Sequence, residues 1–436
     1  MEKSVLVISN NCFSSSTNNG KTLESIFSGY KINNLSQLYF TDIICPDFDF
    51  CNRYFRIFDV DVFRSRFFYK LNCGGKVGKD FFNKDIVNSK KKSYLNLSIF
   101  GVAFLRLLRD LLWKTRKWKS LDLEEWCKSL KIDYVFFVAG GSTFSYEVAN
   151  HLASFLNVPI VTFFTDDYLI YPQKNNLFDW IQYNRLNKIA KKTVAGSSLC
   201  FAIGNAMSKT YSNYFDKFFY QIMNSVSFKE YSENENFGSK IFINYFGSLH
   251  TNRWKMIVNL AKTLKRYNIN DVQINVYVAN QPDIKIINAF SKVGVVYKGG
   301  VFGQNLIKSI SQSDILLHIE SDDCNSVSKT KLSISTKIPE YLMSGRPILG
   351  YGPSEVASMQ LLEENQVGVV ISTTDNEAEV SLKLHSITQS LELRKKIGRK
   401  GYNFAIDNFN NDLITRNFEM IIEDTLNENK IKNINK

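Results

Sequence analysis

The sequence predicts an α/β protein with two doubly wound domains, each a parallel sheet covered by helices. Two observations support this: short apolar, β-branched runs recur along the chain, and stretches with helical periodicity separate many of them. Several runs lack polar alternation, which is typical of strands buried on both faces. Alternation of strands and helices favours parallel strands with right-handed crossovers. We therefore expect ligands at the carboxyl ends of the strands, near topological switch points.

The expected strands form two groups. The first group comprises residues 5–9, 38–42, 134–138, 160–165 and 200–203. The second comprises residues 241–246, 272–278, 295–297, 315–319, 347–350 and 368–371. A polar, acidic stretch at residues 229–239 separates the groups and predicts a linker. The predicted domains are therefore residues 1–228 and 240–436, facing a cleft, and the last helix could pack back on the first domain.

Length and composition are those of a globular chain of two or three domains. The chain has 436 residues, of which 44% are hydrophobic and 22% charged, so disordered, collagen-like and coiled-coil classes are excluded. The seven cysteines include no C-x-x-C pair, so we expect neither a metal site nor a disulfide framework. No signal peptide and no run of about 18 apolar residues is visible. We expect a cytoplasmic protein, able to work at the inner face of the plasma membrane.

The chain is basic, and one region is crowded with aromatic and basic residues. The net charge of +12 attracts polyanions. We expect residues 50–120 to be an insertion in the first domain. On a helix, one face would carry Phe104, Leu105, Leu108, Leu111 and Leu112. The following residues include Trp113, Lys114, Arg116, Lys117, Trp118 and Lys119. Two interpretations stay open: a basic amphipathic helix at a membrane surface, or a core-facing helix with a solvated basic end.

Two loops of the first domain follow predicted strands. Residues 10–19 are mostly small and polar, and Gly20 is expected to open a helix whose N-terminus favours anions. Neither a P-loop nor a G-x-G-x-x-G fingerprint is present. The other loop begins with Asp166 and Asp167, whose like charges are costly to bring together. This pair indicates a general base or a partner for sugar hydroxyls; the alternative is helix capping.

The second domain offers a phosphate-binding pattern after its first strand. A turn at Gly247 leads to Arg253 and Lys255 in the first turn of a helix. Basic residues there oppose the helix dipole, so a bound anion would compensate them. An Arg fork with a Lys point charge suits a diphosphate. The alternative is a pair of solvated helix charges.

Two further loops of the second domain could contact a nucleotide. The loop that contains Gly299 and Val301 is rich in glycine, which allows its backbone to approach a planar base closely. A later loop leads through Ser335, Thr336 and Lys337 into a short helix. Its hydroxyls and free amides would hold phosphate oxygens. Glu340 can accept two hydrogen bonds from a vicinal ribose diol.

The run at residues 337–348, K-I-P-E-Y-L-x-S-G-x-P-I, resembles the nucleotide-sugar signature of GT-B glycosyltransferases. The resemblance is to the retaining, family-four-like enzymes of bacterial surface-polysaccharide synthesis. It implies two Rossmann-like domains around a central cleft and a hexosyltransferase-type activity. The donor would be a nucleotide diphosphate-sugar, bound as substrate with no cofactor. The acceptor would be a glycan or lipid-linked saccharide. As further partners of the protein, we expect an anionic membrane surface and no nucleic acid.

The resemblance also implies roles for individual residues. For the donor, it implies that Glu340 binds the ribose and that Arg253 and Lys255 neutralise the diphosphate. Their positions in the loops described above add further donor-binding candidates: Gly247, Gly299, Val301, Ser335, Thr336 and Lys337. The acceptor side falls to Asn19, Gly20, Lys21, Asp166 and Asp167. If transfer is retaining, the leaving phosphate can deprotonate the acceptor; if it inverts, Asp166 or Asp167 is the base. The sequence departs from the family at Leu332, where a second glutamate is common, and Glu320 is the candidate to replace it.

Three other functions fit parts of the sequence. A metal-dependent GT-A enzyme would use a D-x-D motif, which occurs at Asp47 and Asp49 and again at Asp59 and Asp61. A nucleotide-sugar epimerase would share the two-domain fold but consume the donor without an acceptor. A nucleic-acid-binding protein would need a basic face with stacking aromatics, which residues 50–120 could supply.

Overall fold

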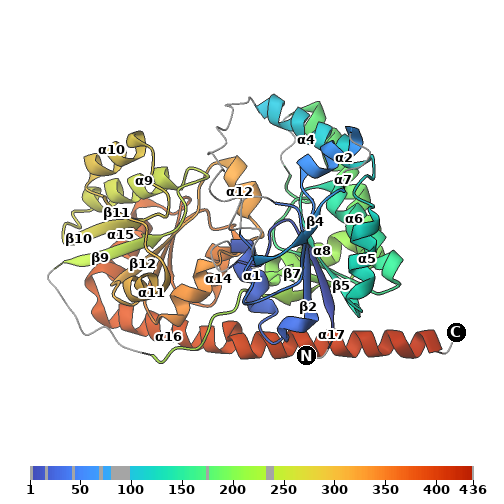
Figure 1. The fold of residues 1–436 in the computed structure, drawn as a ribbon. Coiled ribbons are helices and arrows are strands. Elements are labelled where there is room, and N and C mark those ends of the chain that lie inside the picture. Colours follow the sequence, from blue (N-terminus) through green and yellow to red (C-terminus); the bar gives the residue numbers. More distant parts are fainter. Residues whose placement is uncertain are drawn as a thin grey trace. The chain divides into compact units, whose positions relative to one another are not determined.

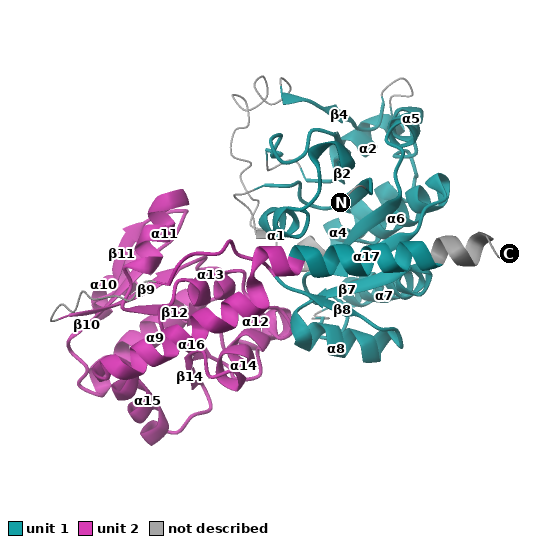
Figure 2. Ribbon diagram, turned by 90° about the horizontal axis from the view of Figure 1, so that it is seen from below, with its two compact units in different colours: residues 1–223, 415–436 teal, residues 224–414 magenta. Residues whose placement is uncertain are grey.

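The computed structural model describes residues 3–14, 18–41, 45–67, 72–79, 99–172, 176–231 and 240–434. Contacts divide the chain into two compact units, residues 1–223 with 415–436, and residues 224–414 (Figure 2). Each unit is a sheet with helices packed on it, as predicted (Figure 1). The predicted domain limits, 1–228 and 240–436, stay a prediction.

Unit 1 contains an eight-stranded sheet in the order β4-β3-β2-β1-β5-β6-β7-β8. All neighbouring strands are parallel except β3 and β4. The strands are β1 (Val5–Ser9), β2 (Leu35–Tyr39), β3 (Tyr54–Arg56), β4 (Gly75–Val77), β5 (Tyr134–Ala139), β6 (Ile160–Phe164), β7 (Leu199–Ile203) and β8 (Tyr220–Ile222). The chain leaves β1 toward β2 and later returns to β5 on the other side, so the switch point lies between β1 and β5.

The helices of unit 1 cover this sheet. They are α1 (Asn18–Ile26), α2 (Asp59–Phe67), α4 (Ile99–Trp113), α5 (Leu121–Ser129), α6 (Thr143–Leu156), α7 (Leu177–Gly196) and α8 (Gly204–Phe215). Ser120 and Asn176 cap α5 and α7 by accepting hydrogen bonds from backbone amides. The last helix, α17 (Asn411–Ile434), joins unit 1 from Thr415 onward. Its Phe418 packs edge-on against Phe27 and lies in ring contact with Phe136 and Phe201.

Residues 50–120 are not a separate insertion, contrary to the sequence-based expectation. Within this region the structure describes residues 50–67, 72–79 and 99–120. The first two ranges contain strands β3 and β4, which belong to the main sheet, and helix α2 between them. Strands β3 and β4 are three residues each, too short for a periodicity to register. The sequence also misplaced β2, which starts at Leu35 because Leu35 and Ser36 pair with Val5 and Leu6.

The tryptophans of this region are buried, which corrects the idea that they line a membrane surface. Trp113 is stacked on Phe144 at a centroid distance of 3.9 Å, and its indole N–H donates to Asp59 Oδ1 at 2.7 Å. Trp118 is also buried and donates to the carbonyl of Trp113. Three leucines that precede them on α4 remain exposed: Leu105 at 49%, Leu108 at 44% and Leu111 at 50%.

Unit 2 contains a six-stranded, wholly parallel sheet in the order β11-β10-β9-β12-β13-β14. The strands are β9 (Ile241–Phe246), β10 (Val272–Tyr277), β11 (Val296–Gly299), β12 (Ile315–Ile319), β13 (Ile348–Gly352) and β14 (Val369–Ser372). The helices are α9 (Arg253–Arg266), α10 (Ile284–Val293), α11 (Gly303–Ser311), α12 (Cys324–Thr330), α13 (Lys337–Met343), α14 (Ala357–Glu364), α15 (Glu377–Gln389) and α16 (Leu391–Phe409). All six strands were predicted to within two residues, and the switch point lies between β9 and β12.

The predicted linker, 229–239, is only partly described, because residues 232–239 lie outside the described ranges. Residues 229–231 belong to unit 2 and contact Tyr402 of its helix α16. The Tyr402 hydroxyl donates to the Lys229 carbonyl at 2.7 Å, and the Tyr231 ring lies 5.1 Å from that of Tyr402. Gly345 has φ +69°, and a Cβ there would come 2.7 Å from the Tyr231 ring. Glycine is therefore required at this helix end by both backbone angle and packing.

Phe418→Ala tests the packing of α17 on unit 1. We expect a loss of about 3–5 kcal/mol in the free energy of unfolding, because a buried ring leaves a cavity among other aromatic rings. The measurement is urea unfolding followed by tryptophan fluorescence, since Trp113, Trp118, Trp126 and Trp180 all lie in unit 1. Met420→Ala on the same helix is the control, because Met420 is 56% exposed. Equal effects of the two substitutions would contradict this packing.

Candidate nucleotide-sugar and acceptor sites

The loop from β9 to α9 lies at the carboxyl edge of the unit 2 sheet, beside the switch point. Asn252 precedes α9 with φ +60°, which sends the chain sharply into the helix. Arg253 and Lys255 then occupy the first turn, as predicted. Lys255 is exposed, and among the described residues no carboxylate pairs with it; its ammonium lies 5.8 Å from the Trp254 ring centroid. Lys255 therefore offers an uncompensated positive charge at this edge.

Arg253 differs from Lys255 because it is already paired. Its Nη2 donates to both carboxylate oxygens of Glu320, at 2.9 and 3.2 Å. Glu320 follows β12 and is only 3% exposed. Burial is the largest single effect on Arg253 and lowers the pKa of its guanidinium, but Glu320 and Tyr245 together outweigh burial, so the pKa lies above its ordinary value. Arg253 Nε, by contrast, is buried with no hydrogen-bond partner in the described structure.

His318, which the sequence gave no reason to select, lies beneath this pair. Its Nε2 is 2.9 Å from Ser358 Oγ and 3.5 Å from Glu320 Oε1. Burial lowers the pKa of His318 to about 4, against the opposing effect of Glu320. His318 is therefore neutral at pH 7, and the Glu320 charge is balanced by Arg253.

Glu340 lies in α13, whose position is fixed on β9. The Tyr341 hydroxyl donates to the Phe246 carbonyl and accepts from the Phe246 amide, both at 3.1 Å. The structure therefore brings the 335–340 segment to the same edge as Arg253. Glu340 is ion-paired with Lys337, one turn earlier, at 3.1 Å. Lys337 thus orients the carboxylate that was predicted to bind ribose.

The predicted phosphate contacts of α13 rest on its side chains and amides. Thr336 occupies the N-cap position without a capping hydrogen bond from its side chain, and Ser335 Oγ accepts from the Lys337 amide at 3.4 Å. The helix has only seven residues, so its dipole is small. Leu332, at which the sequence analysis noted the lack of a glutamate, is buried and offers no charge.

The loop at Gly299 and Val301 follows β11, the edge strand of the same sheet. Gly299 has φ +82°, which favours glycine. A Cβ on Gly300 would lie 3.2 Å from the Ala279 backbone, so this turn also needs a small residue. Tyr277, which the sequence analysis did not select, connects this loop to β9. Its carbonyl accepts from the Gly247 amide at 3.2 Å, and its ring stacks on Phe246 at 4.6 Å.

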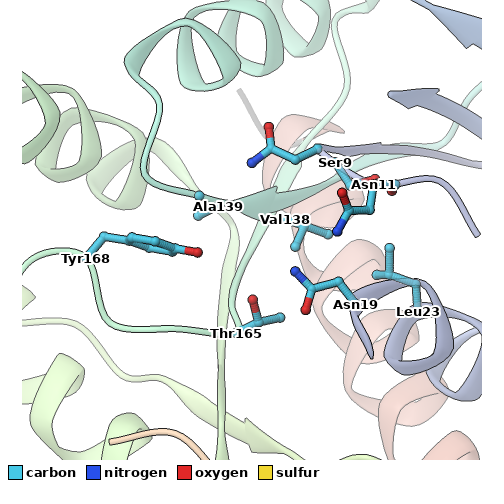
Figure 3. Close-up of a pocket in the computed structure, with 10 residues that line it drawn as sticks. Ser9, Asn11, Asn19, Leu23, Val138, Ala139, Thr165 and Tyr168 are labelled. Atoms are coloured by element: carbon cyan, nitrogen blue, oxygen red, sulfur yellow. The ribbon is translucent and has the colours of Figure 1, made fainter. Parts of the chain in front are cut away.

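Unit 1 has a pocket of its own at its switch point. It is lined by residues that follow β1, the end of β5, the first turns of α1, and Thr165 and Tyr168 after β6 (Figure 3). Asn19 lines this pocket, and its predicted acceptor-side role stays a prediction. The helix opens at Asn18, two residues earlier than predicted; Gly20 is buried in its first turn, and Lys21 is exposed outside the pocket lining.

Asp166 and Asp167 have different environments. Asp167 accepts hydrogen bonds from the amides of residues 169, 170 and 171 and from the Tyr211 hydroxyl, all within 3.0 Å. Both its oxygens are used to hold the turn after β6. Asp166 lies 3.5 Å from the Tyr168 hydroxyl and 3.4 Å from the Thr165 hydroxyl, two pocket-lining groups. Asp166 is therefore the better candidate for a base, and Asp167 the structural partner.

The D-x-D motifs serve local structure. Asp59 accepts from Arg109 and Trp113, and Asp61 caps the amide of Phe58 at 2.9 Å. Asp47 accepts from the amide of Asp49 at 2.9 Å. Across the described residues, no cluster of three or more His, Cys, Asp or Glu is placed to hold a metal ion. The motif interpretation therefore has no structural support.

The fold is that of known glycosyltransferases. A glycosyltransferase from Rickettsia africae ESF-5 has a TM-score of 0.61 and 14% identity, covering 98% of this chain and 99% of that one. TarM has a TM-score of 0.61 and 11% identity, covering 98% and 99%. WaaG, a glycosyltransferase of lipopolysaccharide biosynthesis, has a TM-score of 0.58 and 12% identity, covering 96% and 99%. The chain has their GT-B fold, and the predicted fold class is confirmed.

Sequence comparison adds nothing to this assignment. No protein-family model matches the chain, and no curated protein sequence is significantly similar to it. One further structural neighbour, a TarM variant from S. aureus (TM-score 0.51, 14% identity, 70% and 58% covered), was solved with Fondaparinux, alpha-GlcNAc-glycerol and UDP. At these identities the similarity shows the fold alone.

His318 makes the stability of unit 2 sensitive to acid. Its folded pKa, about 4, lies below the unfolded value of about 6.5, so the unfolded chain binds more protons between these values. Stability from the neutral, buried imidazole is present above pH 6.5 and is lost as pH falls toward 4, by up to about 1.4 kcal/mol per pH unit. His318→Gln should remove this dependence, so the stability difference from wild type should shrink as pH falls.

Urea unfolding at several values between pH 4 and 7 measures that difference. His385→Gln is the control, because His385 is a partly exposed histidine on α15 that contacts Gln389. A wild-type minus His318→Gln difference that stays constant over this pH range would contradict the assignment.

Proposed function

We propose that this protein is a glycosyltransferase that moves a sugar from a nucleotide diphosphate-sugar to a hydroxyl acceptor. The observation that carries the proposal is the convergence, at one edge of a GT-B fold's unit 2 sheet, of Lys255, the Arg253–Glu320 pair and Glu340. This edge offers cationic groups for a diphosphate and an oriented carboxylate for a ribose. We propose a glycan or lipid-linked saccharide as acceptor, as in surface-polysaccharide synthesis.

The donor-side roles follow from the local geometry. Lys255 supplies an uncompensated point charge for the diphosphate, and Arg253 supplies a directional donor from a guanidinium fixed by Glu320. Glu340, held by Lys337, accepts from the ribose hydroxyls. The glycine turn at Gly299 leaves room for a base. UDP-sugars are the first donors to test, because the S. aureus TarM structure contains UDP.

Stabilisation of the leaving diphosphate is the main catalytic contribution of these residues. Negative charge builds on the diphosphate as its bond to the sugar breaks. Preorganised cations and hydrogen-bond donors at that position lower the barrier. We propose a retaining reaction, in which the departing phosphate removes the acceptor proton. If the reaction inverts, Asp166 is the residue placed to act as base, since Asp167 is occupied. An epimerase on this fold is not favoured, because the structural neighbours are transferases.

Lys255→Ala tests the diphosphate role. We expect kcat/KM for the nucleotide-sugar to fall about 10²- to 10³-fold, because a charge that stabilises the transition state is lost. The measurement is release of nucleoside diphosphate from UDP- and GDP-sugars in the presence of a lipid-linked saccharide. Lys262→Ala is the control, since Lys262 is exposed on the same helix, farther from its first turn. If the wild-type protein neither binds the nucleotides nor forms product, the proposed function is refuted.

We also propose that unit 1 contacts an anionic membrane through three adjoining helices. Helix α4 packs against α2 and α7 (Figure 1). Their outer faces expose large apolar side chains, between 43% and 67% of each, at Val60, Phe63, Phe67, Phe104, Leu105, Leu108, Leu111, Leu177 and Trp180. We call these nine residues the apolar face. Large exposed apolar residues gathered on helices that pack together favour a macromolecular or membrane contact over plain solvent exposure.

Charge at the apolar face favours lipid as the occupant. Arg64, Arg66 and Arg106 are exposed among its residues, and none of the described carboxylates pairs with them. Lys114 and Arg116 are exposed just after α4. Apolar side chains flanked by cations complement an anionic bilayer surface. In the described part of the chain, no helix is both long enough and apolar enough to cross a membrane.

Leu105→Glu with Leu108→Glu tests the membrane contact. We expect at least about tenfold weaker sedimentation with phosphatidylglycerol vesicles, because two apolar side chains lose their burial in the interface and two negative charges are added. UDP binding should be unchanged. Leu382→Glu in unit 2 is the control, since Leu382 is 71% exposed. If the double variant binds vesicles as well as wild type, the apolar face is not a membrane contact. If wild type is a dimer and the double variant is a monomer, the apolar face contacts a second copy of the chain.

A further inference from the structure

A buried histidine stands behind the Arg253–Glu320 pair. His318 lies in β12 and Glu320 just after it, two residues on, so their side chains share one face of the sheet. His318 Nε2 lies 3.5 Å from Glu320 Oε1 and 2.9 Å from Ser358 Oγ, and all three side chains are buried. The Arg253 side chain, by contrast, is 22% exposed. A ligand can therefore reach the guanidinium but not the carboxylate or the imidazole behind it.

Few groups in this cluster can balance the charge of Glu320. Within the described part of unit 2, its recorded ion-pair partners are Arg253 and, when protonated, His318. Tyr245 also faces Arg253, but burial is the main cause that raises the pKa of its phenol to about 12, so Tyr245 stays neutral. Its hydroxyl donates to the Ser248 carbonyl at 2.6 Å. His318 is therefore the group that can replace Arg253 as a partner of Glu320.

The backbone of Glu320 is held in place by β13. Its amide donates to the Tyr351 carbonyl at 3.2 Å. Gly352 packs so closely that a Cβ there would come 2.6 Å from the Glu320 carbonyl oxygen and 3.1 Å from the Glu320 Cβ. These contacts fix the residue at the end of β12, so its carboxylate stays buried when a ligand binds to Arg253.

A bound diphosphate would change the charge balance of this cluster. Its oxygens would accept from the guanidinium and so compete with Glu320 for one positive charge. A buried carboxylate that loses part of its partner is costly, and a proton on His318 Nε2, beside Glu320, would offset that cost. The Ser358 hydroxyl fits both states, because it can donate to the neutral imidazole nitrogen and accept from the protonated one.

We propose that His318 is a positioning residue that takes up a proton from solvent when a nucleotide diphosphate-sugar binds at Arg253. The proposal rests on the transferase function and adds a proton to its donor-binding step. In the free protein burial lowers the pKa of His318 to about 4, with Arg253 acting in the same direction and Glu320 against it. A diphosphate on Arg253 weakens the repulsion and leaves more of the Glu320 charge to His318. Donor binding should therefore strengthen as pH falls.

The test is calorimetric titration of the full chain with UDP-glucose, UDP-N-acetylglucosamine and GDP-mannose. Their diphosphate diesters keep a constant charge between pH 5 and 7, so any proton exchanged belongs to the protein. Titration at pH 6 in buffers of different ionisation enthalpy counts the protons taken up. For a nucleotide-sugar that binds, we expect uptake of about half a proton to one proton, and a Kd that falls about 5- to 10-fold from pH 7 to pH 5.

Two variants assign the proton. His318→Gln should bind the same donor with almost no proton uptake, because an amide can still bond Ser358 but does not titrate. His250→Gln is the matched control: His250 is exposed in the loop from β9 to α9, and the variant should keep the uptake. If circular dichroism shows that His318→Gln does not fold, nitrogen NMR of histidine-labelled wild type decides. One buried imidazole should then become protonated on donor binding at pH 6.

Each outcome has a defined meaning. Uptake that persists in folded His318→Gln, or that disappears in His250→Gln, overturns the proposal. Donor binding by wild type without proton uptake, or with every buried imidazole still neutral, overturns it as well and leaves the transferase function standing. If wild type binds none of the three nucleotide-sugars, the transferase function itself fails and the proton step fails with it.

Discussion

The pair formed by Arg253 and Glu320 determines what the carboxyl edge of the unit 2 sheet can do. The two residues follow β9 and β12, the strands on either side of the switch point, and their bond ties those loops together. A carboxylate as buried as Glu320 needs a partner, because an uncompensated charge there would cost several kcal/mol. The pair is neutral overall. The net positive charge at this edge therefore comes from Lys255, while Arg253 contributes direction rather than excess charge.

The same topological rule gives the two units different chemistry. In each sheet the chain reverses its order beside the first strand, so the loops that follow neighbouring strands meet at one edge. In unit 2 those loops carry an ion pair and a lone lysine, which suit an anionic ligand. In unit 1 they carry asparagines and hydroxyls, with the Asp166 carboxylate beside two of those hydroxyls.

The sequence predicted most of the strands and the loops that lead into α9 and α13, because these depend on local pattern. Strand β9 is an apolar run, and Arg253 stands next to it in sequence. Other features depend on contacts across the fold. Strands β3, β4 and β8 have three residues each and exist through pairing with neighbours. Glu320 lies 67 residues from Arg253. No periodicity indicates that pair, nor the use of both Asp167 oxygens by the turn that follows.

Helix α4 shows how tertiary packing can invert a prediction made from an amphipathic pattern. The pattern correctly placed leucines on one face, but it could not show that Trp113 and Trp118 lie in the interior. Because Trp113 stacks on Phe144 and bonds Asp59, withdrawing it to a lipid interface would unfold that corner of unit 1. Any membrane contact must use leucine, phenylalanine and arginine instead. Such a contact would be shallow and, since part of its energy is attraction between exposed charges, weakened by salt.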